Sequence, residues 1–80
     1  MDIRQQVGNN VRRFREERNW SQEELAFEAD IHRTYISGVE RGIRNPTVMV
    51  LAVIASALGV APAALLEGTR AAQRRSRRKA

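Results

Sequence analysis

The sequence contains no cysteine and only one histidine among its 80 residues. Without cysteine, neither disulfides nor a thiolate metal site can supplement the hydrophobic core. A lone histidine also makes a metal site unexpected, and no cofactor is predicted. A chain of this length is near the lower limit for a self-sufficient core, so we expect one domain. The absence of cysteine fits a reducing compartment, and we expect a cytoplasmic protein.

Signals of several other protein classes are also missing. There is no Gly-rich phosphate loop, no plausible nucleophile with a histidine base, and no pair of carboxylates that marks a pocket. An enzyme is therefore not expected. The first ten residues, MDIRQQVGNN, hold no apolar segment of the length that a secretory signal needs.

Acidic residues are absent from the last eleven positions, and this determines the charge balance. The net charge is +5, yet residues 1–69 contain eight arginines and nine acidic residues, a net charge of −1. Residues 70–80 add six cations and no acid. Nucleic-acid binding by the folded part must therefore rest on local residues. The tail is either a solvated charge run or a source of salt-dependent phosphate contacts.

The spacing of apolar residues predicts an all-α fold that begins with a helix over about residues 3–18. Ile3, Val7, Val11 and Phe14 recur at i, i+4, i+8 and i+11, which places them on one stripe of a helix.

The second helix, residues 22 to about 29, has an unusually complete start signal. Ser21 as N-cap and Glu24 at the third helical position are the pattern of a capping box. Trp20 before the cap and Leu25 at the fourth helical position are placed to form a hydrophobic staple.

Three further helices are predicted at about residues 33–41, 48–58 and 62–67. Asp30 tolerates the left-handed conformation and can turn the chain between the second and third helices. Gly42 and Gly59 fit helix stops. Thr47 fits an N-cap, and Pro62 fits the first position of the last helix.

A membrane anchor is an alternative for one segment. Nineteen consecutive uncharged residues, VMVLAVIASALGVAPAALL, lie between Thr47 and Glu67, and a spanning helix needs about 20 apolar residues. Six of the nineteen are alanine, and the LGVAP stretch is typical of one helix ending and another beginning. We therefore expect no membrane contact.

The second and third predicted helices are separated by very few residues, as in a helix-turn-helix. In that motif the first helix braces the second, which lies in the major groove of DNA. Ala26 and Ala29 are small enough for close helix contact, and Ile31 can plug the turn. The outward face of the third helix carries side chains able to read base edges, since arginine pairs with guanine and hydroxyls adapt to either base class; these are Arg33, Thr34 and Ser37.

Residues 12–60 resemble the lambda-repressor-like helix-turn-helix family, of the Cro and phage-repressor type. The matching stretches are WSQEELA, IHRTYISGVERG, NPT and IASALGV. The resemblance implies a compact five-helix DNA-binding domain, here over residues 1–67. The composition of residues 68–80, rich in arginine, alanine and serine, indicates a basic tail that is disordered or extends the last helix. The resemblance also implies a bacterial or phage-encoded protein that associates with the nucleoid. The stretch RTYISGVERGIRN looks like controller proteins of restriction-modification systems.

The resemblance also implies roles for individual residues. Arg33, Thr34 and Ser37 match positions that contact bases, whereas contacts to the DNA backbone are implied for Gln22, Tyr35, Arg41, Arg44 and Asn45. Gln22 could in addition support a reader on the third helix.

Further implied roles concern the ends of the third helix. Glu40 matches an acid that pairs with a helix arginine, here Arg15. His32 stands where the family often has a capping serine or threonine, and we expect it to cap the helix or to contact a phosphate. Gly38 leaves one reader position without a side chain, and Ala61 replaces a frequent cap before the last helix.

The helix over residues 48–58 is apolar on nearly all sides, which indicates a partner surface. After four residues are assigned to the core, Met49, Val50 and Val53 are left over, and the resemblance adds Leu65 and Leu66 as interface candidates. We expect a homodimer on a palindromic operator, with its two recognition helices about 34 Å apart.

The predicted function is sequence-specific binding of double-stranded DNA by a transcriptional regulator. One alternative is an antitoxin-type protein whose apolar surface binds another protein. Another is an interaction module of the same fold that does not read DNA. That module would bind DNA without sequence preference and only through the tail.

Overall fold

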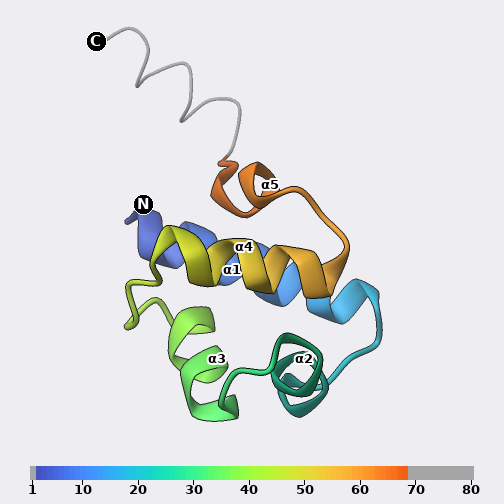
Figure 1. Cartoon of the computed structure of the whole chain (residues 1–80). Helices are drawn as coiled ribbons and strands as arrows, with labels where there is room; N and C mark the ends of the chain where they lie inside the picture. Colours follow the sequence, from blue (N-terminus) through green and yellow to red (C-terminus); the bar gives the residue numbers. More distant parts are fainter. Residues whose placement is uncertain (1, 69–80) are drawn as a thin grey trace, which may run out of the picture.

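The computed structural model describes residues 2–68, and all secondary structure in this part of the chain is helical (Figure 1). The five helices are α1 (Ile3–Glu17), α2 (Gln22–Ala29), α3 (Arg33–Glu40), α4 (Val48–Leu58) and α5 (Pro62–Leu66). Each begins at the predicted residue and ends within one residue of the predicted end, which confirms the all-α fold class.

The capping signals before and after α2 form the expected hydrogen bonds. The Glu24 backbone N–H donates to Ser21 Oγ at 3.1 Å, and the Ser21 N–H donates to Glu24 Oε1 at 2.9 Å. Asp30 adopts the left-handed conformation, with φ 57°. The Ile31 N–H then returns to the Ala26 carbonyl at 2.9 Å. This short turn fixes where α3 begins.

The long uncharged stretch is divided between α4 and α5. Thr47 Oγ1 accepts from the Val50 N–H at 3.1 Å at the start of α4, and Gly59 ends that helix with φ 73°. In the described part of the chain, no helix has both the length and the apolar character needed to cross a membrane. Glu67 is extended, so α5 does not continue beyond Leu66. The predictions for the rest of the tail lie outside the described residues.

The core collects one face of every helix. Its buried residues are Val7, Val11, Leu25, Ala26, Ile36, Val39, Leu51, Ile54, Ala55, Leu58 and Leu65. Trp20 packs against this cluster from the position predicted for the staple. The expectation for Ile3 needs correction, because its side chain is exposed at the first position of α1.

α1 is the helix around which the domain is organised. It packs against α3 on one side and against α5 on the other, and Figure 1 shows α2 and α3 on the opposite side of α1 and α4 from α5. The Asn10 side-chain amide donates to the carbonyls of Leu65 and Glu67, at 2.9 and 2.7 Å, and so attaches the C-terminal end of α5. The apolar pattern of α1 did not reveal this role.

The contact between α1 and α3 is close enough to require a glycine. A Cβ atom at Gly8 would overlap the backbone carbonyl oxygen of Val39 and lie 2.7 Å from that of Glu40. Glycine disfavours a helix by about 1 kcal/mol relative to alanine, so Gly8 is explained by this backbone approach and not by local preference.

The carboxylate of Glu40 joins α3 to α1 and α2. Its side chain is fully buried and accepts hydrogen bonds from Arg15 Nε at 2.7 Å, Arg15 Nη2 at 3.0 Å and Gln22 Nε2 at 3.0 Å. Arg12 Nε lies 3.6 Å away. Arg15 Nη1 also donates to the Trp20 carbonyl at 2.7 Å, so the network includes the chain that enters α2.

Two opposing effects set the pKa of Glu40. Burial alone would raise it, but the hydrogen bonds from Arg15 and Gln22, together with the charges of Arg15 and Arg12, outweigh burial. The pKa of Glu40 is therefore lowered from its ordinary value of 4.5. The carboxylate is ionised at neutral pH, and its bonds stabilise the fold in that state.

We predict that Glu40→Gln lowers the free energy of unfolding at pH 7 by about 3 kcal/mol, because the mostly buried Arg15 side chain loses its charge partner. Since the folded pKa is depressed, the stabilisation is present above pH 4.5 and is lost as pH falls through the folded pKa. The difference between the two proteins should therefore shrink with acidification. Urea denaturation at pH 7 and pH 3 measures it.

The matched control is Asp2→Asn, which removes the exposed Asp2–Arg4 ion pair, 3.0 Å long, and keeps a good N-cap residue. Its denaturation midpoint at pH 7 should stay close to that of the wild type. A gap between wild type and Glu40→Gln that does not change from pH 7 to pH 3 would contradict the assignment.

Candidate nucleic-acid interface

The outward face of α3 presents the residues that the sequence singled out. Arg33 and Thr34 are exposed, Ser37 is partly exposed, and Ile36 and Val39 on the opposite face are buried in the core. This division follows from helical periodicity, which separates the two faces of a short helix. The exposed face therefore offers a guanidinium and two hydroxyls at the start and middle of α3.

Arg33 lies near an acidic residue of α2. Its Nη1 atom lies 4.0 Å from Glu23 Oε1 on α2, and both side chains are mostly exposed. An exposed pair at this distance contributes little stability. The Arg33 side chain can therefore leave Glu23 and contact another acceptor, such as a guanine edge, at small cost.

Gln22 occupies the first position of α2 and is partly buried. Its amide nitrogen donates to Glu40, so it supports the buried carboxylate at the end of α3. The expectation that Gln22 supports a reader on α3 needs correction, because the hydrogen bond goes to Glu40 and not to the exposed face. Its contact with a DNA phosphate stays a prediction.

His32 stands at the N-cap position of α3, with extended backbone, but its side chain makes no capping hydrogen bond. The capping role considered for His32 is therefore wrong. The imidazole is exposed beside Arg33, which leaves the phosphate contact as its predicted role.

The segment after α3 forms the edge of the same surface. Arg41, Arg44 and Asn45 are exposed, while Tyr35 is half-buried and packs against the core. The guanidinium carbon of Arg44 lies 5.4 Å from the centroid of the Tyr35 ring, a cation–π arrangement. Two residues predicted separately to contact the DNA backbone thus lie together.

Gly38 is not an empty position on the exposed face. It is buried, and a Cβ atom added there would lie 2.5 Å from Arg44 Cγ. The interpretation of Gly38 as a reader position without a side chain needs correction, because the Arg44 side chain fills this space. No local pattern in the sequence predicts this contact, since the two residues belong to different elements.

Exposed apolar side chains lie on α4 and α5. Met49 is 75% exposed, and Val53 and Leu66 are also exposed. Val48, 81% exposed at the start of α4, belongs with them although the sequence reasoning did not name it.

Leu65 and Val50 are more buried than the other residues predicted for the interface. Leu65 is fully buried within the core of the domain, so its assignment to a dimer interface is wrong: in this fold it has no surface to offer a partner. Val50 is half-buried and packs against the core, which leaves only part of its side chain for a partner.

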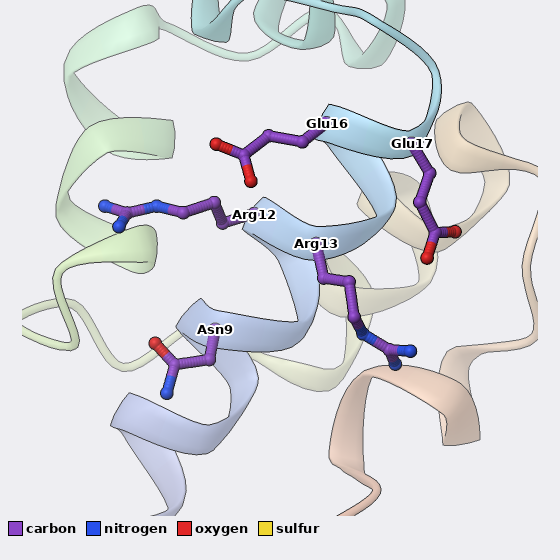
Figure 2. Close-up of a pocket in the computed structure, with 5 residues that line it drawn as sticks. All are labelled: Asn9, Arg12, Arg13, Glu16 and Glu17. Atoms are coloured by element: carbon purple, nitrogen blue, oxygen red, sulfur yellow. The ribbon is translucent and has the colours of Figure 1, made fainter.

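A shallow depression on α1 lies apart from these residues. Figure 2 shows its lining of Asn9, Arg12, Arg13, Glu16 and Glu17, with Arg12 directed toward α3 and Arg13 directed away from it. The lining mixes both signs of charge and includes none of the residues predicted to contact DNA. We therefore place the candidate interface on α3 and the segment that follows it.

Comparisons with known proteins agree with this geometry. A family model described as helix-turn-helix matches residues 11–65. Control protein C.BamHI of Bacillus amyloliquefaciens is 51% identical over 69 residues, which cover 85% of this chain and 85% of that protein. The solved structure of the hypothetical transcription factor NHTF from Neisseria has a TM-score of 0.83 at 40% identity, covering 91% of this chain and 84% of that one.

A third relative has been solved with DNA. The restriction-modification controller protein C.Esp1396I, as a tetramer in complex with its natural 35-base-pair operator, has a TM-score of 0.75 at 34% identity. The match covers 81% of this chain and 86% of that one. The resemblance recognised in the sequence is thereby confirmed. The chain belongs to the helix-turn-helix family of transcriptional regulators.

Proposed function

We propose that this protein is a sequence-specific transcriptional regulator that binds a palindromic operator as a homodimer, with α3 in the major groove. The observation that carries the proposal is the exposed face of α3, which begins with Arg33 and Thr34 and is braced from behind by α1 and α2. The similarity to control proteins favours a controller of a restriction-modification system, acting in the cytoplasm on nucleoid DNA.

Within this proposal, Arg33, Thr34 and Ser37 contact base edges. Arginine can donate two hydrogen bonds to guanine O6 and N7, and the two hydroxyls adapt to donors or acceptors. The contacts to the DNA backbone come from Gln22, His32, Tyr35, Arg41, Arg44 and Asn45. Such contacts set the position of α3 on the duplex, whereas the base contacts determine the sequence that is bound.

The exposed apolar residues of α4 and α5 form the proposed dimer surface, defined as Val48, Met49, Val53 and Leu66, with part of Val50. α5 lies on the opposite side of α1 and α4 from α3 (Figure 1), so a contact through it leaves α3 uncovered. A twofold dimer presents two copies of α3 to successive major grooves about 34 Å apart. Two copies also multiply the few base contacts that one short helix can make.

We predict that Arg33→Ala abolishes the enrichment of a palindromic sequence from a pool of random DNA, because the bidentate contact with guanine is lost. Each specific contact of this kind contributes about 1–3 kcal/mol of discrimination, or roughly fivefold to 150-fold in affinity at each half-site. Sequencing of the retained DNA and measurement of its dissociation constant report both effects.

Arg13→Ala is the matched control, since it removes an exposed arginine that points away from α3 (Figure 2). It should enrich the same palindrome as the wild type. If Arg33→Ala enriches that palindrome as well as Arg13→Ala does, α3 is not the reading helix and the protein-interaction alternative gains support.

We predict that Met49→Glu converts the dimer to a monomer, because it buries a charge without a partner in the apolar contact. Light scattering coupled to size exclusion measures the mass. Phe27→Glu is the control: Phe27 on α2 is 82% exposed and lies outside the proposed dimer surface. A Met49→Glu protein that stays dimeric would show that the copies meet elsewhere.

A further inference from the structure

The helical conformation of residue 38 does not explain why this residue is a glycine. It is within α3, and the glycines with positive φ in the described chain are Gly42 and Gly59. Glycine in a helix costs about 1 kcal/mol relative to alanine. The backbone conformation therefore does not require glycine at this position. We look for the reason for this glycine in the atoms that pack beside it.

The space beside Gly38 is occupied by Arg44. A Cβ atom would lie 2.5 Å from Arg44 Cγ, 3.5 Å from its Cδ and 3.4 Å from its Nε. Cγ is close to the backbone of Arg44, so this contact cannot be relieved by a small movement of the guanidinium alone. A methyl group at Gly38 would therefore require the Arg44 side chain to move away from Gly38, beginning at Cγ.

The backbone of Gly38 fixes the same residue. The Gly38 carbonyl accepts hydrogen bonds from the N–H groups of Ile43 and Arg44, at 3.0 and 3.2 Å. Gly42, with φ 77°, turns the chain so that these donors can reach back. These hydrogen bonds fix the backbone of Arg44 and therefore the point from which its side chain begins. The Cγ, Cδ and Nε atoms of Arg44 then pack in the space beside Gly38.

The Tyr35 ring supports the other end of Arg44, with the guanidinium carbon 5.4 Å from its centroid. Tyr35 lies about one helical turn before Gly38, at i−3, so the Arg44 side chain runs along α3 from Gly38 to the Tyr35 ring. Arg44 as a whole remains exposed. A long side chain ordered before binding loses less conformational entropy when it meets its ligand.

We propose that Gly38 is a positioning residue that lets Arg44 lie across α3 onto Tyr35, so that a loop arginine takes the place of the missing side chain at position 38. This inference rests on the proposed function, because the ligand for which it positions Arg44 is a phosphate of the operator. It assigns to Gly38 a role in DNA affinity although the residue has no side chain that could contact DNA.

The test compares Gly38→Ala, Arg44→Ala and the double variant on the palindromic DNA that the wild type selects, across a salt series. Gly38→Ala should weaken binding about as much as Arg44→Ala, roughly tenfold for a charge-assisted hydrogen bond. The slope of log K against log salt should decrease by about one for each lost phosphate contact. The double variant should bind no more weakly than Arg44→Ala alone.

Stability and the free protein provide independent readouts. Gly38→Ala should melt no lower than the wild type, because alanine favours the helix. In the DNA-free protein, nuclear Overhauser contacts between the Arg44 side chain and the Tyr35 ring should be present in the wild type and lost in Gly38→Ala. The nuclear Overhauser measurement tests the position of Arg44 even if the wild type selects no DNA. Failure of the wild type to select DNA would refute the proposed function and not the contact between Gly38 and Arg44.

Two results would overturn the inference. Wild-type affinity in Gly38→Ala would show that Arg44 does not need the open space. A further loss of binding when Gly38→Ala is added to Arg44→Ala would show that the methyl group acts on DNA directly and not through Arg44.

Discussion

The buried carboxylate of Glu40 is the interaction on which the orientation of α3 depends. It ends α3, accepts from Arg15 of α1 and Gln22 of α2, and lies within reach of Arg12. A charge taken out of water is costly unless it is paired and hydrogen-bonded. The hydrogen bonds of this carboxylate therefore constrain how α1, α2 and α3 are placed relative to one another.

That constraint links the packing of the domain to its binding surface. Gly8 allows the backbone of α1 to meet the end of α3, and the short turn after Asp30 fixes the start of α3. With both ends held, its exposed face is presented as a rigid surface. Rigid elements position contacting side chains more accurately than loops do.

Local signals in the sequence were sufficient to predict where the helices begin and end. The Ser21–Glu24 capping box, the left-handed Asp30 and Pro62 each act within a few residues of themselves, so their effects can be predicted without the fold. The exposed face of α3 was predictable for the same reason, because the buried positions Ile36 and Val39 define its opposite side.

The errors concern contacts between elements that are distant in sequence. Leu65 was expected at an interface because the family resemblance pointed to the last helix, but packing of α5 against α1 and α4 buries it. Gly38 was interpreted from its helix alone, whereas its neighbour comes from the following loop. His32 occupies a capping position without a capping bond. Such outcomes depend on three-dimensional proximity, which one sequence does not contain.

Dimethyl sulfate footprinting of the selected operator, with and without bound protein, tests most directly whether α3 reads the major groove as part of a dimer. The reagent methylates guanine N7 in the major groove and adenine N3 in the minor groove. We expect protected guanines in two groups about 10 base pairs apart, one group for each copy of α3. Protection confined to adenine N3, or a single protected group, would contradict a dimer that reads two successive major grooves.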